Sequence, residues 1–271
     1  MVKMTRRVTF SSGHRYWVPA LSESENRALF GPWASPYNHG HNYVLDVTVE
    51  GNVDPQTGMV VNIKRIDAVL KGGLVKEFDG KSLNDEVAWF YDRPSTLENL
   101  IEYIRGRLDG TLPSEARMVG VRLEEMPTFW AEWQDGKGMT LTRSYEFAAA
   151  HRLHVPALSH EENLDLFGKC NNPAGHGHNY VLEVSVAGDP DPATGMLLDI
   201  GELDAAVHRE VVDRYDHKNL NEDLPEFAGK ATTSEVVAQE IFSRLQNKIP
   251  GRLARVRLWE TARNAFDVEA A

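Results

Sequence analysis

The sequence predicts an α+β protein made of two tandem lobes, each with antiparallel strands and two helices. An internal repeat is the first reason: residues 14–49 align without gaps to residues 151–186, and 22 of the 36 positions are identical. The second reason is that apolar side chains alternate along some segments and recur at helical spacing along others. We expect lobes at residues 1–134 and 140–271, joined by a Gly- and charge-rich linker, since copies of about 130 residues have the usual size of a domain.

Each lobe is expected to run strand, long loop, strand, turn, strand, helix, helix, strand. Alternation predicts strand faces, because successive side chains of a strand point to opposite sides. The faces expected to be buried are Val8, Phe10, Ser12 and His14; Tyr145, Phe147, Ala149 and His151; and His176, His178, Tyr180, Leu182, Val184 and Val186. Turn residues at 54–58 and 191–195 follow the second strand of each lobe.

Apolar residues at spacings of three and four predict the first helix of each lobe. They are Ile200, Leu203, Val207 and Val211 in the second lobe, and Ile63, Ile66, Leu70 and Leu74 in the first. Each second helix is expected to begin at a capping box, at 232–235 and 95–98. The last strand of each lobe places Glu260 or Glu125 on the same face as apolar residues, which is unfavourable for a carboxylate unless a partner or ligand binds it.

Composition and charge exclude several classes of protein. The net charge of −11 argues against a nucleic-acid-binding surface. No apolar run approaches the roughly 20 residues that span a bilayer, and the N-terminus shows no apolar segment of the signal-peptide type. A single cysteine cannot form an intramolecular disulfide and fits a reducing cytosol. We therefore expect a cytoplasmic protein, and the net charge does not exclude an anionic small molecule as its ligand.

Three histidines recur in both copies at constant spacing: His151, His176 and His178, and, in the first copy, His14, His39 and His41. The two histidines of an H-x-H pair on a strand lie on the same face, and a third at the end of a neighbouring strand can join them. Three neutral imidazoles with an open fourth position are the usual ligands of a catalytic zinc ion. The sequence predicts such a site in the second copy and a second candidate site in the first.

Two further features are present only in the second copy. Cys170 follows Lys169, a setting that favours the thiolate, whereas the first copy has Trp33 at this position. Asp216 and His217 could together orient a proton shuttle, and the first copy has Asp79-Gly80. The loss of both the thiol and the second imidazole indicates that the first lobe has lost a shared catalytic task.

These motifs resemble the 6-pyruvoyl-tetrahydropterin synthase family, which includes the bacterial 6-carboxytetrahydropterin synthases of the queuosine pathway. The resemblance rests on six motifs of the second lobe: Phe147–Arg152, Leu166–Pro173, Gly175–Tyr180, Asp216–Asn221, Thr232–Glu235 and Glu260. It covers residues 140–269, and a weakened form covers 5–130. The long loop before Cys170 is more similar to the pyruvoyl-forming members.

The resemblance implies a tunnelling fold whose lobes join edge to edge into β-barrel rings, and the substrate 7,8-dihydroneopterin triphosphate. It assigns zinc to His151, His176 and His178, proton transfer to Cys170 with Asp216 and His217, and pterin binding to Glu260, with Thr232 and Thr233 as further contacts. Arg152 or Lys169 is expected to receive the triphosphate. Trp33 is expected to block the pocket of the first lobe.

Family members build the site across lobe boundaries, with the cysteine and the Asp-His pair from different lobes. This implies a homo-oligomer with rings of like lobes, such as a trimer of two-lobed chains, with a dimer or tetramer as the alternative. Three other functions stay open: a 6-carboxytetrahydropterin synthase, a pterin- or purine-binding protein without turnover, and aldolase or epimerase chemistry on dihydroneopterin.

Overall fold

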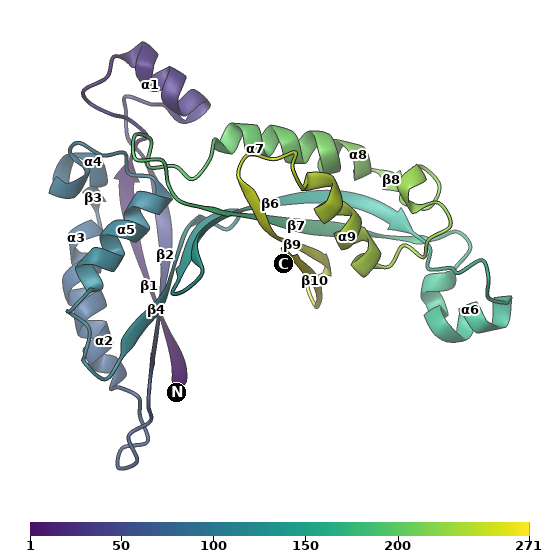
Figure 1. The fold of residues 1–271 in the computed structure, drawn as a ribbon, viewed down its shortest axis with the longest axis horizontal. Coiled ribbons are helices and arrows are strands. Elements are labelled where there is room, and N and C mark those ends of the chain that lie inside the picture. The colour runs from purple at the N-terminus through teal and green to yellow at the C-terminus, as the bar shows by residue number, and fades with distance from the viewer. Residues whose placement is uncertain (271) are drawn as a thin grey trace. The chain divides into compact units, whose positions relative to one another are not determined.

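The structure is a computed structural model in which residues 1–270 are described, and they form two compact units (Figure 1). The first unit contains residues 1–141 and the segment 187–199, and the second contains the other described residues. Both combine strands and helices, which confirms the α+β prediction. Within residues 1–270 no helix has the length and apolarity needed to span a bilayer.

The first repeat contains five strands, five α-helices and three short segments of other helix types. In chain order they are β1 (Val2–His14), α1 (Glu23–Phe30), the 3-10 helix η1 (Gly31–Trp33), β2 (His39–Gly51), α2 (Ile63–Val69), the π-helix η2 (Leu70–Val75), α3 (Lys76–Phe78), β3 (Lys81–Ser82), α4 (Leu83–Glu86), the 3-10 helix η3 (Ala88–Phe90), α5 (Leu97–Leu108), β4 (Arg117–Met126) and β5 (Phe129–Gln134).

The second repeat follows the same order but has no counterpart of α4. Its elements are β6 (Gly138–His151), α6 (His160–Phe167), the 3-10 helix η4 (Gly168–Asn171), β7 (His176–Gly188), α7 (Ile200–Val207), the π-helix η5 (His208–Val212), α8 (Asp213–Tyr215), β8 (Lys218–Asn219), the 3-10 helix η6 (Pro225–Phe227), α9 (Ser234–Leu245), β9 (Arg252–Thr261) and β10 (Asn264–Glu269).

The sheet of each unit is open and mainly antiparallel. In the first unit β1 pairs with β2 along its whole length, and β4 joins β2 to β5. In the second unit the order is β10-β9-β7-β6. The prediction of a strand directly after each turn is wrong, because residues 59–62 and 196–199 lie outside any strand. A two-residue strand that pairs in parallel comes later instead, β3 with β1 and β8 with β6.

Helices cover one face of each sheet, and the core lies between them (Figure 1). The alternating residues predicted on this face are mostly buried, and the same aromatic pair occurs in both units. Phe10 stacks on Tyr43 at 5.0 Å between ring centroids, and Phe147 stacks on Tyr180 at 5.1 Å. Offset stacking adds to the stability that their burial provides. Each tyrosine is two residues beyond a histidine of an H-x-H pair, so this packing anchors the strand beside the candidate site.

The helix that begins with α2 in the first repeat and with α7 in the second continues into a π-helical segment at the same place, η2 and η5. The Gly72-Gly73 pair is not its cause, since the second repeat has Arg209-Glu210 there. Beyond the π segment, the carboxylate of Asp79 or Asp216 accepts a hydrogen bond from a backbone N–H of the first strand, at 2.9 and 2.8 Å. The aspartate therefore fixes the end of this helix against the sheet in both repeats.

The capping boxes occur at other helices than predicted. Ser22 with Glu25 caps α1, and Ser159 with Glu162 caps α6, in segments that were expected to be loops. The boxes predicted at 95–98 and 232–235 are wrong. At α5 the cap is Thr96, whose side chain accepts from the N–H of Asn99, and at α9 the Thr233 side chain makes no capping hydrogen bond.

The segment 187–199 packs on the start of α5 within the first unit. Thr96 donates its hydroxyl to the carbonyl of Gly195 at 2.7 Å, and the N–H of Leu197 donates to the Glu98 carboxylate at 2.8 Å. Burial raises the pKa of Glu98 to about 7, against the opposing effect of the Leu197 N–H. Its counterpart in the second repeat, Glu235, is exposed.

We predict that Glu98 makes stability depend on pH. Its folded-state pKa of about 7 lies above the ordinary 4.5, so the folded protein holds a proton that the unfolded chain releases. The stability that this proton provides is complete below pH 4.5 and is lost as the pH rises to about 7, by roughly 3 kcal/mol. Glu98→Gln should remove this loss, as measured by denaturant unfolding at pH 5 and pH 8. Glu235→Gln is the control and should leave the pH dependence of stability unchanged. If Glu98→Gln shows the same pH dependence as the unaltered chain, Glu98 is not its cause.

Candidate functional site

Three imidazoles converge where the first two strands of each repeat meet. His151 ends β6, and His176 and His178 lie at the start of β7; one nitrogen from each ring lies within 4.8 Å of the others. His151 Nε2 and His176 Nε2 are 3.2 Å apart. Ligands bonded to zinc at 2.0–2.1 Å in a tetrahedron are about 3.3 Å apart. In the first unit His14, His39 and His41 form an equivalent group.

A backbone carbonyl fixes the orientation of the innermost histidine in each group. His151 Nδ1 lies 2.7 Å from the carbonyl oxygen of Thr232, and His14 Nδ1 lies 2.9 Å from that of Ser95. Because a carbonyl oxygen only accepts, Nδ1 carries the proton and Nε2 offers its lone pair to the centre of the group. This arrangement is usual for a metal-binding histidine.

The chemistry of both groups fits a divalent metal ion. Within residues 1–270 the buried Nε2 atoms of His14, His41 and His178 have no hydrogen-bond partner. Burial lowers the pKa of His14 to about 3 and that of His41 to about 4, and it also lowers that of His151. A lowered pKa favours the neutral form of these three rings, which is the form that binds a metal.

Glu260 lies beside the second group, held by two side-chain donors. Ser234 Oγ donates to Oε1 at 2.7 Å and Asn264 Nδ2 donates to Oε2 at 3.3 Å. Burial acts to raise the pKa of Glu260, but these two hydrogen bonds and the neighbouring imidazoles outweigh it, and the pKa lies below its ordinary value. An ionised carboxylate next to the histidines can accept two N–H groups of a ligand.

The two predicted threonines have different surroundings. Thr232 is fully buried, and its hydroxyl donates to Asn221 Oδ1 and to the Arg152 carbonyl. It thereby supports the loop whose carbonyl binds His151. Thr233 is half-buried at the start of α9. Of the two, Thr233 is the one with an accessible surface for a ligand.

Cys170 is a free, half-buried cysteine in η4, and its carbonyl accepts the N–H of Leu153. Asp216 and His217 lie at the end of α8, where the Asp216 carboxylate accepts from His217 Nδ1 at 2.8 Å. No hydrogen bond or ion pair among residues 1–270 links this pair to Cys170 or to the histidine group. The Asp-His pair therefore has its own internal hydrogen bond, and its role with the thiol stays a prediction.

The backbone of His217 adopts a conformation that favours glycine, with φ of 58°, and the side chain is 83 % exposed. In the first repeat the same position is Gly80, with φ of 70°. A non-glycine residue in the left-handed region costs free energy, and such residues concentrate at functional sites. An exposed imidazole kept at this cost supports a functional role that Gly80 cannot have.

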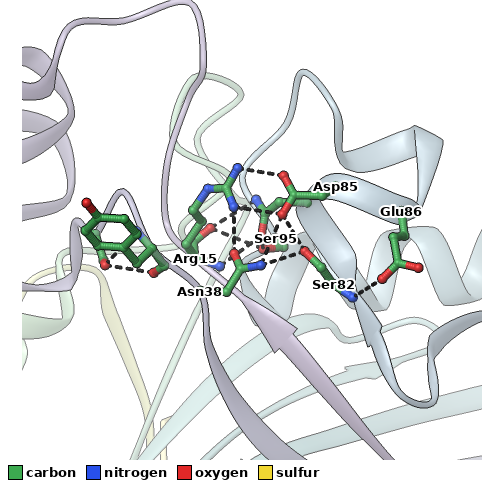
Figure 2. A network of polar contacts seen from close by, with 9 residues as sticks. Arg15, Asn38, Ser82, Asp85, Glu86 and Ser95 are labelled. Carbon is green, nitrogen blue, oxygen red and sulfur yellow. Dashed lines mark hydrogen bonds and ion pairs between the residues drawn. The ribbon is translucent and has the colours of Figure 1, made fainter.

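Arg152 is a further site residue, and its side-chain partners differ from those of its counterpart in the first repeat. Figure 2 shows that Arg15, its counterpart, is held in a polar network with Asp85, Asn38 and Ser82. The Arg15 guanidinium binds both Asp85 oxygens at 2.8 and 2.9 Å. None of the ion pairs within residues 1–270 involves Arg152.

Arg152 instead donates to the carbonyl of Asn171 and lines a cavity of about 160 Å³ together with His154, Gly175 and Lys230. Gly175 replaces Asn38, and Glu222 replaces Asp85. Sequence reasoning named Arg152 but missed Lys230 and the Ser234–Glu260 hydrogen bond. For Ser234 the signal was available in the repeat itself, since the first copy has Leu97 there, whereas Lys230 aligns with Arg93, another basic residue.

Comparison with known proteins identifies the family. The profile described as 6-pyruvoyl tetrahydropterin synthase matches the chain twice, over residues 3–135 and 140–271. The chain belongs to this family. It is a tandem duplication of the family domain, as the repeat predicted.

Three relatives illustrate the range of the family. The human 6-pyruvoyl tetrahydrobiopterin synthase is 47% identical over 125 residues, which cover 46% of this chain and 86% of that protein. The 6-carboxy-5,6,7,8-tetrahydropterin synthase of Haemophilus influenzae is 27% identical and covers 45% of this chain and 92% of its own length. The solved Caenorhabditis elegans 6-pyruvoyl tetrahydropterin synthase is 41% identical, with a TM-score of 0.47 and coverage of 49% and 95%.

We predict that glycine at position 217 relieves backbone strain. His217→Gly should be more stable than His217→Ala by roughly 1 kcal/mol, because both lack the imidazole and only glycine adopts a positive φ at little cost. Gly80→Ala should lose a similar amount, since nothing lies within 4 Å of the added methyl group and only the conformational cost remains. Denaturant unfolding measures all three variants; equal stability of His217→Gly and His217→Ala would refute the strain.

Proposed function

We propose that this chain is a zinc-dependent lyase that converts 7,8-dihydroneopterin triphosphate to 6-pyruvoyl-tetrahydropterin with loss of triphosphate. The observation that carries the proposal is the group of His151, His176 and His178 with Glu260 beside it. The half of the chain that has these residues also has Cys170 and the Asp216–His217 pair. The catalytic site is assigned to this second half.

The pyruvoyl product is favoured over the carboxy product because the relatives named for the pyruvoyl reaction have the higher sequence identity to this chain. The human relative named for the pyruvoyl reaction is 47% identical, whereas the Haemophilus influenzae relative named for the carboxy reaction is 27% identical. The 6-carboxytetrahydropterin synthase remains the alternative reaction. A pterin-binding protein without turnover is the alternative in another class, and the retention of His14, His39 and His41 in a half without the thiol favours it.

Each residue has a role that its surroundings support. Zinc bound to the three imidazoles would supply Lewis acidity at the side-chain hydroxyls of the substrate and so make the adjacent C–H bonds more acidic. Glu260, ionised and held by Ser234, would accept the N–H groups at the edge of the pterin. Cys170 would move the protons between carbons, and His217, oriented by Asp216, would exchange them with solvent.

Arg152 and Lys230 would bind the triphosphate, because Arg152 is next to His151 in the chain and lines a cavity with Lys230. In the first half the equivalent Arg15 is already neutralised by Asp85, and the side chain of Asn38 occupies the place of Gly175. The first half therefore lacks this anion site as well as the thiol. It would serve as a scaffold, with Trp33 blocking its pocket.

The proposed enzyme is a homo-oligomer in which the Asp216–His217 pair of one copy completes the site of another. This is consistent with the absence of any hydrogen bond within residues 1–270 between that pair and Cys170. The arrangement favoured is one with rings of like lobes, such as a trimer of two-lobed chains, with a dimer or tetramer as the alternative.

We predict that the zinc-loaded chain releases triphosphate and a 6-pyruvoyl pterin, as identified by mass spectrometry of the products. Cys170→Ala should abolish turnover while substrate affinity stays within about twofold, because the thiol moves protons and does not anchor the ligand. A 6-carboxy product would select the alternative reaction. Unchanged substrate with metal present would favour the binding protein.

A mixing experiment tests the shared site. Cys170→Ala and His217→Ala chains, inactive alone, should regain part of the activity when they are unfolded together and refolded as mixed oligomers. In one of the two orders in which the variants can be neighbours, the contact pairs an intact thiol with an intact imidazole, and in the other it pairs the two substituted positions. If the mixture stays inactive although mixed oligomers form, the site lies within one chain.

We also predict that Arg152→Ala raises KM by about 10- to 100-fold, the effect of losing a charge-assisted hydrogen bond of 1.5–3 kcal/mol. The kcat should change less, because the phosphate is held before and during the reaction. Arg15→Ala is the matched control and should leave both constants unchanged. An equal effect of the two substitutions on KM would show that Arg152 acts through folding.

A further inference from the structure

The turn that follows the long second strand of each repeat has the same conformation in both. In the first repeat Gly58 has a φ of 69° and its N–H donates to the Asp54 carbonyl at 2.8 Å. In the second repeat Gly195 has a φ of 66° and its N–H donates to the Asp191 carbonyl at 2.7 Å. In each turn the aspartate carboxylate also accepts two backbone N–H groups. Both turns are therefore held in one shape by their own residues.

Burial distinguishes the two turns. Met196 and Ile200, in and just after the second turn, are 6 % and 2 % exposed. Their counterparts Met59 and Ile63 are 43 % and 41 % exposed. Because the residue types are identical and the turns have the same shape, the difference comes from what packs on them. The turn of the first repeat thus presents apolar side chains to solvent that its counterpart buries.

The start of α5 packs on the turn of the second repeat. Thr96 donates its hydroxyl to the Gly195 carbonyl at 2.7 Å, and Glu98 accepts the N–H of Leu197 at 2.8 Å. The approach is close, because a Cβ atom at Gly195 would collide with the side chain of Asn99. This contact therefore joins the turn of the second repeat to the helix α5 of the first, through one threonine and one glutamate.

The helix α9 begins with the counterparts of these two residues. Thr233 aligns with Thr96, and Glu235 aligns with Glu98. The Thr233 side chain makes no capping hydrogen bond, and Glu235 is exposed. Among residues 1–270 no hydrogen bond or ion pair involves either of these two side chains. The start of α9 therefore repeats the binding surface of α5, with no turn bound to it.

The contact at α5 is head-to-tail. It covers one turn and one helix start, and it leaves the equivalent turn and the equivalent helix start exposed. A contact with two-fold symmetry would cover both pairs, because each partner would present the same surface to the other. A head-to-tail contact instead leaves one complementary surface at each end, and further copies of the chain can bind there. The two surfaces left are the turn at residues 53–63 and the start of α9.

We propose that the turn at residues 53–63 of one copy docks on the start of α9 of a second copy. As at α5, Thr233 donates its hydroxyl to the Gly58 carbonyl of the other copy, and Glu235 accepts the N–H of Val60. Met59 becomes buried in this contact. The hydroxyl of Thr233, an expected pterin contact, is then engaged by protein.

This docking adds a contact between unlike halves to the oligomer proposed above. In stacked rings of like halves, it runs from one ring to the other and is supplied by the next copy. It stands without the lyase reaction, because it rests on the turns and helix starts alone.

Cross-linking tests which copy supplies the turn. In chains with Cys170→Ser, Val60→Cys and Glu235→Cys are placed on separate, co-expressed chains that are treated with a short bismaleimide. A covalent dimer on a denaturing gel is expected only when both variants are present. The matched control is Leu197→Cys with Glu98→Cys in one chain, which should cross-link within that chain and give no dimer.

Self-association in solution gives a second measurement. Met59→Asp should weaken association by roughly tenfold or more, because a charge replaces an apolar side chain within the contact. Sedimentation at several chain concentrations measures this change. Met59 is exposed in a single copy, so the unfolding free energy of the separated chain should stay the same. Tyr91→Asp changes an exposed apolar side chain outside the turn and should leave association unchanged.

Two results would overturn the docking. One is a cross-link that stays within the chain when Val60→Cys and Glu235→Cys share one chain, since the turn then binds its own α9. The other is no cross-link while the control pair reacts, together with normal association of Met59→Asp. Product formation is a separate readout: an inactive chain that cross-links between copies refutes only the lyase, and an active chain without this cross-link refutes only the docking.

Discussion

The hydrogen bond between a buried histidine and a backbone carbonyl is the constraint on which each site depends. His151 and Thr232 are 81 residues apart in sequence, and His14 and Ser95 have the same separation. Each bond ties the end of the first strand to the loop before the last helix, and it also fixes the tautomer of the ring. The hydroxyl of Thr232 then binds the next carbonyl, that of Arg152, so the loop cannot move without moving the histidine.

The two halves show which residues serve the fold and which serve chemistry. Asp79 and Asp216 both bind a strand N–H, so this carboxylate is kept for structure. The side chain of His217 makes no such bond to a strand. The first repeat has Gly80 at this position, and glycine adopts the positive φ more easily. Arg15 shows the opposite change, since a charge that is available in the second half is neutralised by Asp85 in the first. Duplication thus provides an internal control for each assignment.

Sequence patterns predicted the parts of the fold that depend on local periodicity. The pairing of His176 and His178 follows from strand alternation alone, because period two places both side chains on one face. Capping was harder, since four segments match the Ser/Thr-x-x-Glu pattern and only those at 22–25 and 159–162 form the box. At 95–98 the glutamate binds Leu197 instead. The surroundings of Glu260 depend on Ser234 in α9 and Asn264 in β10, which no local motif specifies.

The segment 187–199 sets the order in which the protein can fold during synthesis. The first unit includes residues that follow its own last strand by more than fifty positions in the chain. When a ribosome has made only residues 1–141, the start of α5 lacks the carbonyl of Gly195 and the N–H of Leu197. Domains generally fold as they emerge, with the N-terminal one first. Here the contacts of the first unit are complete only after residues 187–199 of the second repeat have been translated.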